Sequence, residues 1–205
     1  MMKYDTVAVA SGNAHKIKEI GELLMIDGVR FAGMREVGVT GDIEENGASF
    51  RENALIKARE VCRRTGLPAI ADDSGLCVDA LDGAPGIYSA RFASENGHNA
   101  SDAENVAKLL GLLENVPEEK RAAHFISAMA VVMPDGREAV VEGICEGRIT
   151  SAVSGNGGFG YDPVFYYPPF GKTFGEASGE EKNAVSHRRN AVTKLRAELL
   201  TLLGV

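Results

Sequence analysis

A short apolar run, followed at once by a glycine turn and a helical pattern, is the feature that most constrains this chain. Thr6 to Ala10 reads TVAVA and is rich in β-branched residues, which predicts a buried strand. After Ser11-Gly12-Asn13, the apolar residues Ile17, Ile20, Leu23 and Leu24 fall on one face of a helix. We therefore expect the fold to begin with a strand, a tight turn and a helix, as parallel α/β sheets do.

Later segments predict further helices. One is expected from about Ser49 to Arg64, where apolar residues recur at helical spacing before Gly66-Leu67-Pro68. Another should begin at Ser101, which opens a capping-box sequence. The last helix is expected to run without interruption from about Gly179 to Leu203.

Strand-like segments complete a mixed α/β architecture. Pro68 to Ala71 predicts a short buried strand. Phe125 to Met133 and Glu138 to Cys145 are joined by Pro134-Asp135-Gly136, a turn signal that predicts an antiparallel hairpin. We expect one α/β domain over residues 1–205, with parallel elements early, a hairpin late and a cleft between two lobes.

Composition argues against several classes of protein. The 22 Lys and Arg against 29 Asp and Glu give a net charge of −7, which argues against broad binding to nucleic acid. No apolar run approaches the roughly 20 residues of a membrane span, and the N-terminus lacks a signal-peptide pattern. We therefore expect a soluble, cytoplasmic protein. Cys62, Cys77 and Cys145 are widely spaced in apolar stretches, so buried thiols are expected.

The first segment that could carry chemistry is Ser11 to Lys16. A glycine between a strand and a helix lets the backbone approach an anion, and the helix N-terminus and Lys16 supply positive charge. Phosphate binding is one interpretation. The alternative is an ordinary strand-to-helix connection with an N-cap.

Two acidic pairs could bind a metal ion. Glu44-Glu45 precedes the second predicted helix, and Asp72-Asp73 is expected at the end of the strand Pro68 to Ala71. Paired carboxylates there repel one another and lose hydration unless a cation compensates. Mg²⁺ bound together with substrate phosphates would compensate. The alternatives are a solvated loop for Glu44-Glu45 and an Asx turn for Asp72-Asp73.

Two further segments could contact a nucleotide. Gly157 to Pro163 places three glycines around Phe159 and Tyr161, which suits a loop that exposes aromatic rings to a flat base. The alternative is a glycine-rich turn with both rings in the core. Cations are disfavoured near a helix N-terminus, so Lys182, His187, Arg188 and Arg189 in the first half of the last helix suggest a bound anion, unless Glu180 and Glu181 compensate.

Together these segments resemble the inosine/xanthosine triphosphate pyrophosphatase family. The matching stretches run in the family's order along nearly the whole chain, and the most specific are ADDSGL, GAPGIYSAR, GFGYDP and SHR. The resemblance implies an elongated α/β fold with a long mixed sheet flanked by helices, a central substrate cleft and a homodimer. It also implies magnesium-dependent hydrolysis of non-standard purine nucleoside triphosphates, such as ITP and XTP, to the monophosphate and pyrophosphate.

The resemblance implies roles for particular residues. Asp73 matches the catalytic base and a metal ligand, and the second metal ligand is placed at Glu44, with Glu45 as the neighbouring candidate. The residues expected to bind substrate are Ser11, Gly12, Asn13, Ala14, His15, Lys16, Ser74, Phe159, Gly160, Tyr161, Asp162, Lys182, His187 and Arg188.

Two rival functions stay open at this point. A Maf-like pyrophosphatase acting on pyrimidine triphosphates has a related fold but lacks the ADDSGL, GFGYDP and SHR combination. A nucleotide-sensing module would bind without turnover, and an acidic pair beside the metal would bring it no advantage.

Overall fold

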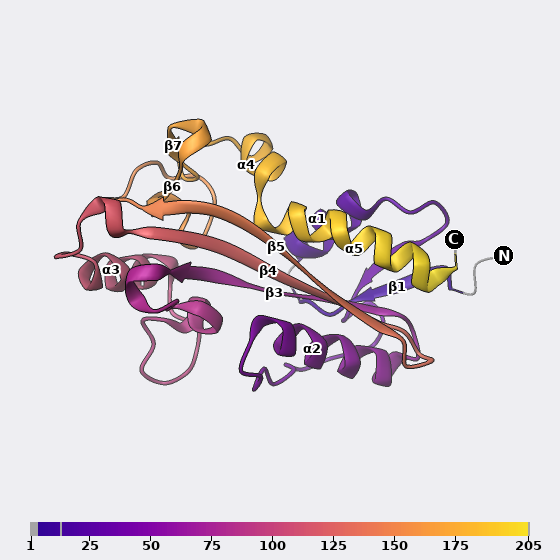
Figure 1. Ribbon diagram of the computed structural model, residues 1–205. Helices are drawn as coiled ribbons and strands as arrows, with labels where there is room; N and C mark the ends of the chain where they lie inside the picture. Colours follow the sequence, from indigo (N-terminus) through magenta and orange to yellow (C-terminus); the bar gives the residue numbers. More distant parts are fainter. Residues whose placement is uncertain (1–3, 13, 205) are drawn as a thin grey trace. The chain divides into compact units, whose positions relative to one another are not determined.

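The computed structural model describes residues 4–12 and 14–204, which form two compact units. Unit 1 comprises Met1–Asp73, Ser127–Gly143 and Arg188–Val205, and unit 2 comprises Ser74–Ile126 and Ile144–His187. The strands are hydrogen-bonded in the order β2-β1-β3-β4-β5-β6-β7, in one mixed sheet (Figure 1). This arrangement confirms the predicted α/β fold class.

Three long strands contribute residues to both units: β3 (Ala69–Val78), β4 (Ala122–Val132) and β5 (Glu138–Ile149). In the turn between β4 and β5, the Gly136 N–H donates to the Met133 carbonyl at 3.0 Å. This turn joins strands that are neighbours in the sheet, which confirms the predicted hairpin.

Strand β3 continues well beyond Ala71, where the sequence pattern predicts its end. Asp72 and Asp73 therefore lie inside the strand, so both the predicted strand end and its alternative, a closing Asx turn, are wrong. Successive side chains of a strand point to opposite faces of the sheet. Two consecutive carboxylates can stay in the strand because each one meets its own polar partners, as described below.

Unit 1 begins with the predicted strand, turn and helix, which are β1 (Thr6–Val9) and α1 (Ala14–Leu24). Strand β1 pairs in parallel with β2 (Arg30–Gly33) and with β3. The register places Ala8 beside both Ala32 and Ala69. These parallel pairs confirm that the fold opens with parallel elements.

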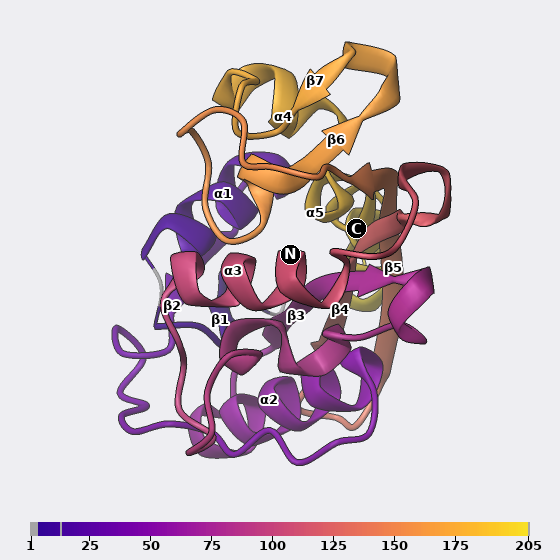
Figure 2. The ribbon, with the colours of Figure 1, turned by 90° about the vertical axis from the view of Figure 1, so that its left-hand side faces the viewer.

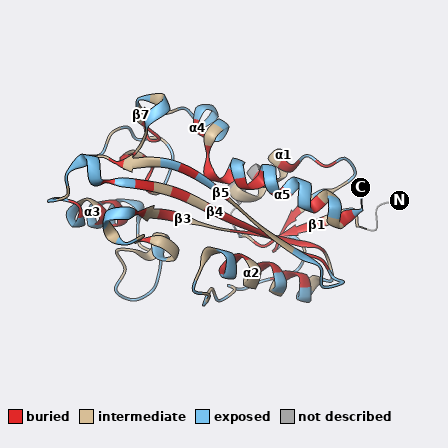
Figure 3. Cartoon of the chain, in the orientation of Figure 1, coloured by how far each residue is buried: buried red, intermediate tan, exposed pale blue. Residues whose placement is uncertain are grey.

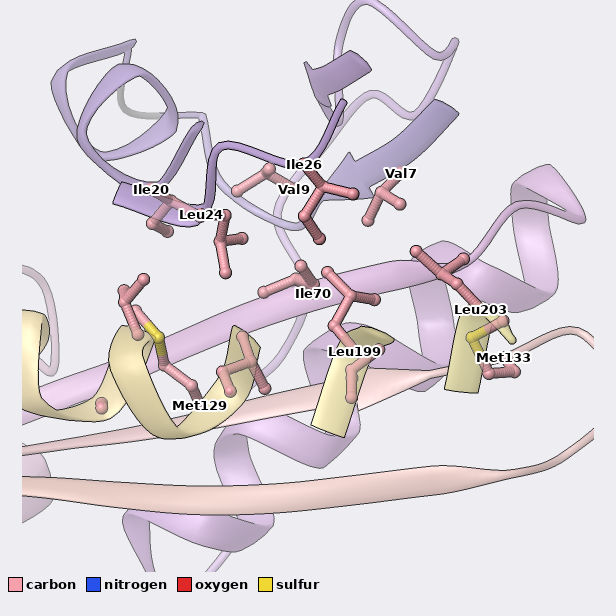
Figure 4. Packing of buried hydrophobic residues seen from close by; sticks show 14 residues of the cluster. Val7, Val9, Ile20, Leu24, Ile26, Ile70, Met129, Met133, Leu199 and Leu203 are labelled. Atoms are coloured by element: carbon pink, nitrogen blue, oxygen red, sulfur yellow. The ribbon is translucent and has the colours of Figure 1, made fainter. Parts of the chain in front are cut away.

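Successive side chains along each strand point to opposite faces of the sheet, so unit 1 has one hydrophobic core on each face. On one face, large residues of β1, β3 and β4 pack with α1 and α5, as Figure 4 shows for Val7, Val9, Ile70, Leu24 and Leu199. On the other face, alanines pack against α2 (Phe50–Thr65), whose buried stripe faces the sheet and whose opposite side is exposed (Figure 3). The alanines of this second core are Ala8, Ala69, Ala71, Ala128 and Ala130 on the sheet, and Ala54 and Ala58 on α2.

Unit 2 contains α3 (Asp102–Leu112), β6 (Phe165–Tyr167), β7 (Lys172–Thr173) and α4 (Gly179–Val185). The predicted capping box of Ser101 is confirmed, with Glu104 as its partner. Helix α4 lies beside β6 and β7 in both ribbon views (Figure 2), and Lys172 binds Glu181 at 2.8 Å. Short 3-10 helices complete the elements: η1 (Asp79–Leu81), η2 (Gly86–Arg91), η3 (Glu118–Lys120), η4 (Asp162–Val164) and η5 (Pro168–Phe170).

The last helix is not continuous, contrary to the prediction from the sequence. Helix α4 ends at Ser186, whose ψ of 151° is extended, and α5 (His187–Leu203) follows. Serine is unfavourable in helix interiors because its hydroxyl forms hydrogen bonds with nearby backbone groups in non-helical conformations. Lys182 therefore lies in the last turn of α4, where the helix dipole favours a cation. No helix in the described part of the chain has both the length and the apolarity needed to span a membrane.

Candidate functional site

The candidate site residues form two groups, one in each unit. We call the unit 1 group the acidic set, made of Glu45, Lys57, Asp72, Asp73, Lys16 and Arg188. We call the unit 2 group the aromatic set, made of Phe159, Tyr161, Asp162, Lys182 and His187. The boundary between the units falls between Asp73 and Ser74 and again between His187 and Arg188, so the two groups are covalently adjacent at His187-Arg188.

Asp73 shares a buried lysine with Glu45. The Lys57 Nζ lies 2.8 Å from Glu45 Oε2 and 3.4 Å from Asp73 Oδ1, and it also donates to the Asp72 carbonyl at 3.0 Å. Burial by itself would lower the pKa of Lys57, but the carboxylates of Asp73 and Glu45 outweigh it, so this pKa is raised. Lys57 therefore stays charged and holds the two carboxylates near one ammonium.

The second oxygen of Asp73 is the most reactive feature of the acidic set. Asp73 Oδ2 is buried and makes no hydrogen bond with any residue that the structure describes. Burial raises the pKa of Asp73 to about 6, although Lys57 and Asn53 act in the opposite direction. A buried carboxylate oxygen without a hydrogen bond is costly unless a cation or a water proton occupies it.

These residues fit a magnesium ion. Within the described residues there is no cluster of three or more His, Cys, Asp or Glu side chains that could hold a metal by itself. Mg²⁺ does not need such a cage, because it is commonly bound by one or two carboxylates together with substrate phosphates and water. Asp73 and Glu45 offer that number of carboxylates, and Asp73 Oδ2 is available to a ligand.

Of the two glutamates in the acidic loop, Glu45 is the one beside Asp73. Glu44 is exposed and lines a surface groove of about 470 Å³ with Arg59, Arg63 and other residues of α2. Neighbouring residues of an extended loop point in different directions, so only one of the pair can face β3. The geometry therefore favours Glu45, the neighbouring candidate, as the second carboxylate.

Asp72 faces away from Asp73 and organises two cations. It is buried, its Oδ1 accepts the Ser127 hydroxyl at 2.6 Å, and its Oδ2 lies 2.9 Å from Lys16 Nζ and 3.4 Å from Arg188 Nε. Two cations beside one carboxylate could also donate charge-assisted hydrogen bonds to a phosphate. Asp72 thus brings Lys16 of α1 and Arg188 of α5 together.

The predicted anion-binding turn is described only in part. Ser11 is half-buried and Gly12 exposed, and a Cβ on Gly12 would lie 3.8 Å from the Arg35 guanidinium. Arg35 therefore adds a cation to this turn that the sequence pattern did not indicate. Asn13 lies outside the described residues, as do the side chains of Ala14 and His15.

In unit 2, Asp162 shapes the glycine-rich loop. It is buried, and its Oδ2 accepts both the Phe159 N–H at 2.8 Å and the ammonium of Lys182. Gly158 has a φ of +74°, which glycine adopts without strain. Gly160 donates its N–H to Asp102 at 2.6 Å. Asp162 was expected to contact substrate, and the structure shows it holding the loop and Lys182.

The two aromatic residues of this loop behave differently. Tyr161 is buried in the core and donates its hydroxyl to the Ser89 carbonyl at 2.8 Å. Phe159 is 58% exposed, and the Lys182 Nζ lies 4.2 Å from its ring centroid. The core alternative therefore describes Tyr161, and Phe159 is the ring that a flat ligand can reach. His187 is buried and stacks on Phe125 at 5.0 Å, while Ser74 is half-buried in β3.

Sequence reasoning missed Lys57 and the role of Asp72. Lys57 follows Ala54 by three residues and precedes Val61 by four, so it falls within the apolar stripe of α2. A lysine in a buried stripe needs an anionic partner, and that was the available signal. For Asp72, only the long-range packing of α1, β4 and α5 on β3 reveals its partners.

Comparison with known proteins gives one consistent family. The Ham1 family matches residues 7–198. The dITP/XTP pyrophosphatase of Geobacillus kaustophilus (strain HTA426) is 47% identical over 198 residues, 97% of this chain and 96% of the relative. That of Yersinia pseudotuberculosis serotype I (strain IP32953) is 50% identical over 188 residues, 91% and 93% of the two chains.

Solved structures agree with the sequence relatives. A HAM1 protein from Coxiella burnetii has a TM-score of 0.88 and 41% identity, covering 96% of this chain and 98% of that chain. A nucleoside-triphosphatase / dITP/XTP pyrophosphatase from Mycobacterium abscessus has a TM-score of 0.78 and 45% identity, covering 93% and 98%. The family that the sequence motifs suggested is confirmed, and this chain belongs to the Ham1 family.

Proposed function

We propose that this protein hydrolyses non-standard purine nucleoside triphosphates, namely ITP, dITP, XTP and dXTP, to the nucleoside monophosphate and pyrophosphate. The observation that carries the proposal is the buried oxygen Asp73 Oδ2, which has no hydrogen bond among the described residues and lies on a carboxylate shared with Lys57 and Glu45. The names of the relatives, dITP/XTP pyrophosphatases, support the substrate class.

Asp73 and Glu45 would hold the metal, which we assign to Mg²⁺. When bound, the ion would neutralise part of the charge that the triphosphate carries. Asp73 would orient a water and accept its proton as the water oxygen bonds to phosphorus and the anhydride bond between the α- and β-phosphates breaks. Pyrophosphate would then leave, and the nucleoside monophosphate would remain. Lys16 and Arg188, held by Asp72, would bind phosphate oxygens through charge-assisted hydrogen bonds.

The aromatic set would select the base. Phe159 offers an exposed ring on which a purine can stack. Hypoxanthine and xanthine carry an acceptor at position 6, where adenine carries an amino donor. A donor on His187 would favour the acceptor, because adenine would leave that donor without a partner in a desolvated pocket. Guanine shares that acceptor and must be rejected at its 2-amino group.

We further propose that the chain acts as one functional domain, as a homodimer, in the cytoplasm and without nucleic acid as a partner. The net charge of −7 supports the last of these, because a basic footprint is what nucleic-acid binding requires.

The test is a pyrophosphate-release assay with and without Mg²⁺ on ITP, XTP, dITP, GTP, ATP and UTP. We expect release from ITP, dITP and XTP to exceed release from ATP by about 10,000-fold or more, the discrimination that a site gives when the wrong substrate leaves its buried polar groups unpaired. Preference for UTP would indicate the Maf-like activity instead. Tight binding of ITP without release would indicate a nucleotide sensor.

A further inference from the structure

Ser127 is a buried serine in a row of apolar side chains on β4. Side chains at alternate positions of a strand share one face of the sheet, so Ser127 shares its face with Met129, Val131 and Met133. Those three residues belong to the core that packs with α1 and α5. Ser127 is the polar member of this row, and a buried hydroxyl is costly unless it has a hydrogen-bond partner.

The partner of Ser127 is the carboxylate of Asp72. By the same alternation, Asp72 shares a face of β3 with Ile70, which belongs to that core. The Ser127 hydroxyl donates to Asp72 Oδ1 at 2.6 Å. A hydroxyl–carboxylate distance of about 2.5 to 2.7 Å is typical of a charge-assisted hydrogen bond, which is stronger than a neutral one. Ser127 therefore fixes one oxygen of the Asp72 carboxylate.

The other oxygen of Asp72 meets the two cations. Oδ2 lies 2.9 Å from Lys16 Nζ, and 3.4 Å from both Nε and Nη2 of Arg188. The cations differ in exposure, because the side chain of Lys16 is 30% exposed and that of Arg188 is 5% exposed. A phosphate that arrives from solvent therefore reaches the Lys16 ammonium more readily than the Arg188 guanidinium.

We propose that Ser127 is a positioning residue for phosphate binding, which acts through Asp72 and determines where the Lys16 ammonium lies. The inference rests on the proposed function. With Oδ1 held by the hydroxyl, Oδ2 is the oxygen that faces Lys16. Without the hydroxyl, the carboxylate can rotate and offer a different oxygen to each cation, and the Lys16 ammonium would move with it. Ser127 is buried and needs no contact of its own with the phosphate.

Thr173 provides a matched control in unit 2. It is also a buried hydroxyl residue on a strand. Its hydroxyl lies 2.7 Å from the Ser154 carbonyl and 3.1 Å from Glu176 Oε2. Thr173→Val therefore removes a buried hydroxyl beside a carboxylate and leaves the residues around Asp72 unchanged.

The experiment is a calorimetric titration of the full chain with inorganic tripolyphosphate in EDTA, which measures binding by the protein's own cations without a metal ion. The variants are Ser127→Ala, Ser127→Thr, Lys16→Met and Thr173→Val. We expect Ser127→Ala to raise the Kd by about tenfold, a size typical of coupling within one hydrogen-bonded network. Ser127→Thr keeps the hydroxyl and should keep the wild-type Kd, as should Thr173→Val.

A double variant tests whether Ser127 acts through Lys16. Once Lys16→Met has removed the ammonium, adding Ser127→Ala should weaken tripolyphosphate binding no further. In steady-state assays with Mg²⁺, Ser127→Ala should raise the KM for ITP by the same factor as the Kd. Its kcat should change little, because a binding interaction made equally in the ground state and the transition state affects KM alone.

The outcomes separate the inference from the function on which it rests. If Ser127→Ala lost stability in urea as Thr173→Val should, yet kept the wild-type Kd and KM, Ser127 would be only structural. Additive losses in the double variant would overturn the inference, as would a wild-type chain that binds no tripolyphosphate. Should Ser127→Ala fail to fold, Ser127→Cys, which is similar in shape and only a weak donor, decides the same question. If the wild-type chain released no pyrophosphate from ITP, the proposed function would fail, and the tripolyphosphate titration would still test the role of Ser127.

Discussion

Each unit buries a lysine against an aspartate, and the two ion pairs leave different groups available. In unit 1, Lys57 contacts Asp73 Oδ1, and Asp73 Oδ2 remains without a hydrogen bond among the described residues. In unit 2, Asp162 Oδ2 accepts from both Lys182 and the Phe159 N–H. The same pair of residue types therefore leaves a reactive oxygen in unit 1, whereas in unit 2 it fixes a loop and leaves an aromatic ring exposed.

This contrast shows that burial of an ion pair does not by itself reveal its role. The second contact of each carboxylate decides whether it can react. Asp162 also holds the backbone N–H of Phe159 and so has a structural role, while Asp73 keeps a buried oxygen without a hydrogen bond among the described residues, which a proton or a metal ion could occupy. Substitutions in the Lys57–Asp73 pair and in the Lys182–Asp162 pair should therefore cause different losses of activity and of stability.

The largest effect is expected for Asp73→Asn. Removing a general base typically costs about 100- to 10,000-fold in rate, and here a metal ligand is lost as well. We expect kcat for ITP to fall by at least that range while the far-ultraviolet circular dichroism stays that of the wild type. Asp162→Asn should lower activity less, because Asp162 acts through the loop. A variant Asp73→Asn with wild-type turnover would contradict the assignment of the base.

Lys57→Met should cause the largest loss of stability. It leaves Glu45 and Asp73 together without their ammonium, and removing one partner of a buried ion pair costs about 3 kcal/mol. Lys182→Met should cost less, because Asp162 keeps the Phe159 N–H as a donor. Urea unfolding of both variants at pH 7 measures the difference. Equal losses in the free energy of unfolding would contradict the proposed difference between the two ion pairs.

In the metal-free protein, the free energy of unfolding should depend on pH because Asp73 is buried. Burial raises the pKa of Asp73 to about 6 in the folded chain, against 3.8 for an unperturbed aspartate. The folded state therefore binds the proton more tightly, and this contribution to stability is present below about pH 4 and is lost as the pH rises through 6. Asp73→Asn should match the wild type at pH 4 and exceed it by about 2 kcal/mol at pH 7.5 in EDTA. A constant difference between these pH values would contradict the buried-carboxylate interpretation.

The smallest effect is expected for Phe159→Ala. Stacking of a base on an aromatic ring contributes about 1 to 3 kcal/mol, so KM for ITP should rise by about tenfold or more, with little change in kcat. Because Phe159 is 58% exposed, the free energy of unfolding should hardly change. Steady-state kinetics and urea unfolding measure both quantities. A fall in kcat with unchanged KM would place Phe159 outside base binding.

Local sequence signals predicted most of the fold correctly. Three of these elements depend only on residues that are close together in the sequence. They are the strand and helix around Ser11-Gly12, the capping box at Ser101 and the turn at Pro134-Asp135-Gly136. The break at Ser186 was missed because the apolar stripe continues across it. The end of β3 was misplaced because carboxylates rarely occur inside buried strands, and their partners come from distant elements.

The candidate site was less accessible to sequence reasoning. The motif resemblance indicated Asp73, and the structure adds Lys57 and the role of Asp72. Lys57 reaches β3 because α2 packs on the sheet through alanines, which brings the helix close enough for this side chain to reach the strand. The partners of Asp72 come instead from α1, β4 and α5. The choice between Glu44 and Glu45 likewise depends on how the loop lies on α2, which neighbouring residues in the sequence do not determine.

The division of the chain has a consequence for how such a protein can change over generations. The polypeptide passes between the units four times, after Asp73, Ile126, Gly143 and His187. No single gene segment therefore encodes either unit, and a recombination event with one or two junctions cannot exchange all of unit 2 for another. New substrate preferences must arise by point changes in place, while both halves go on sharing three strands.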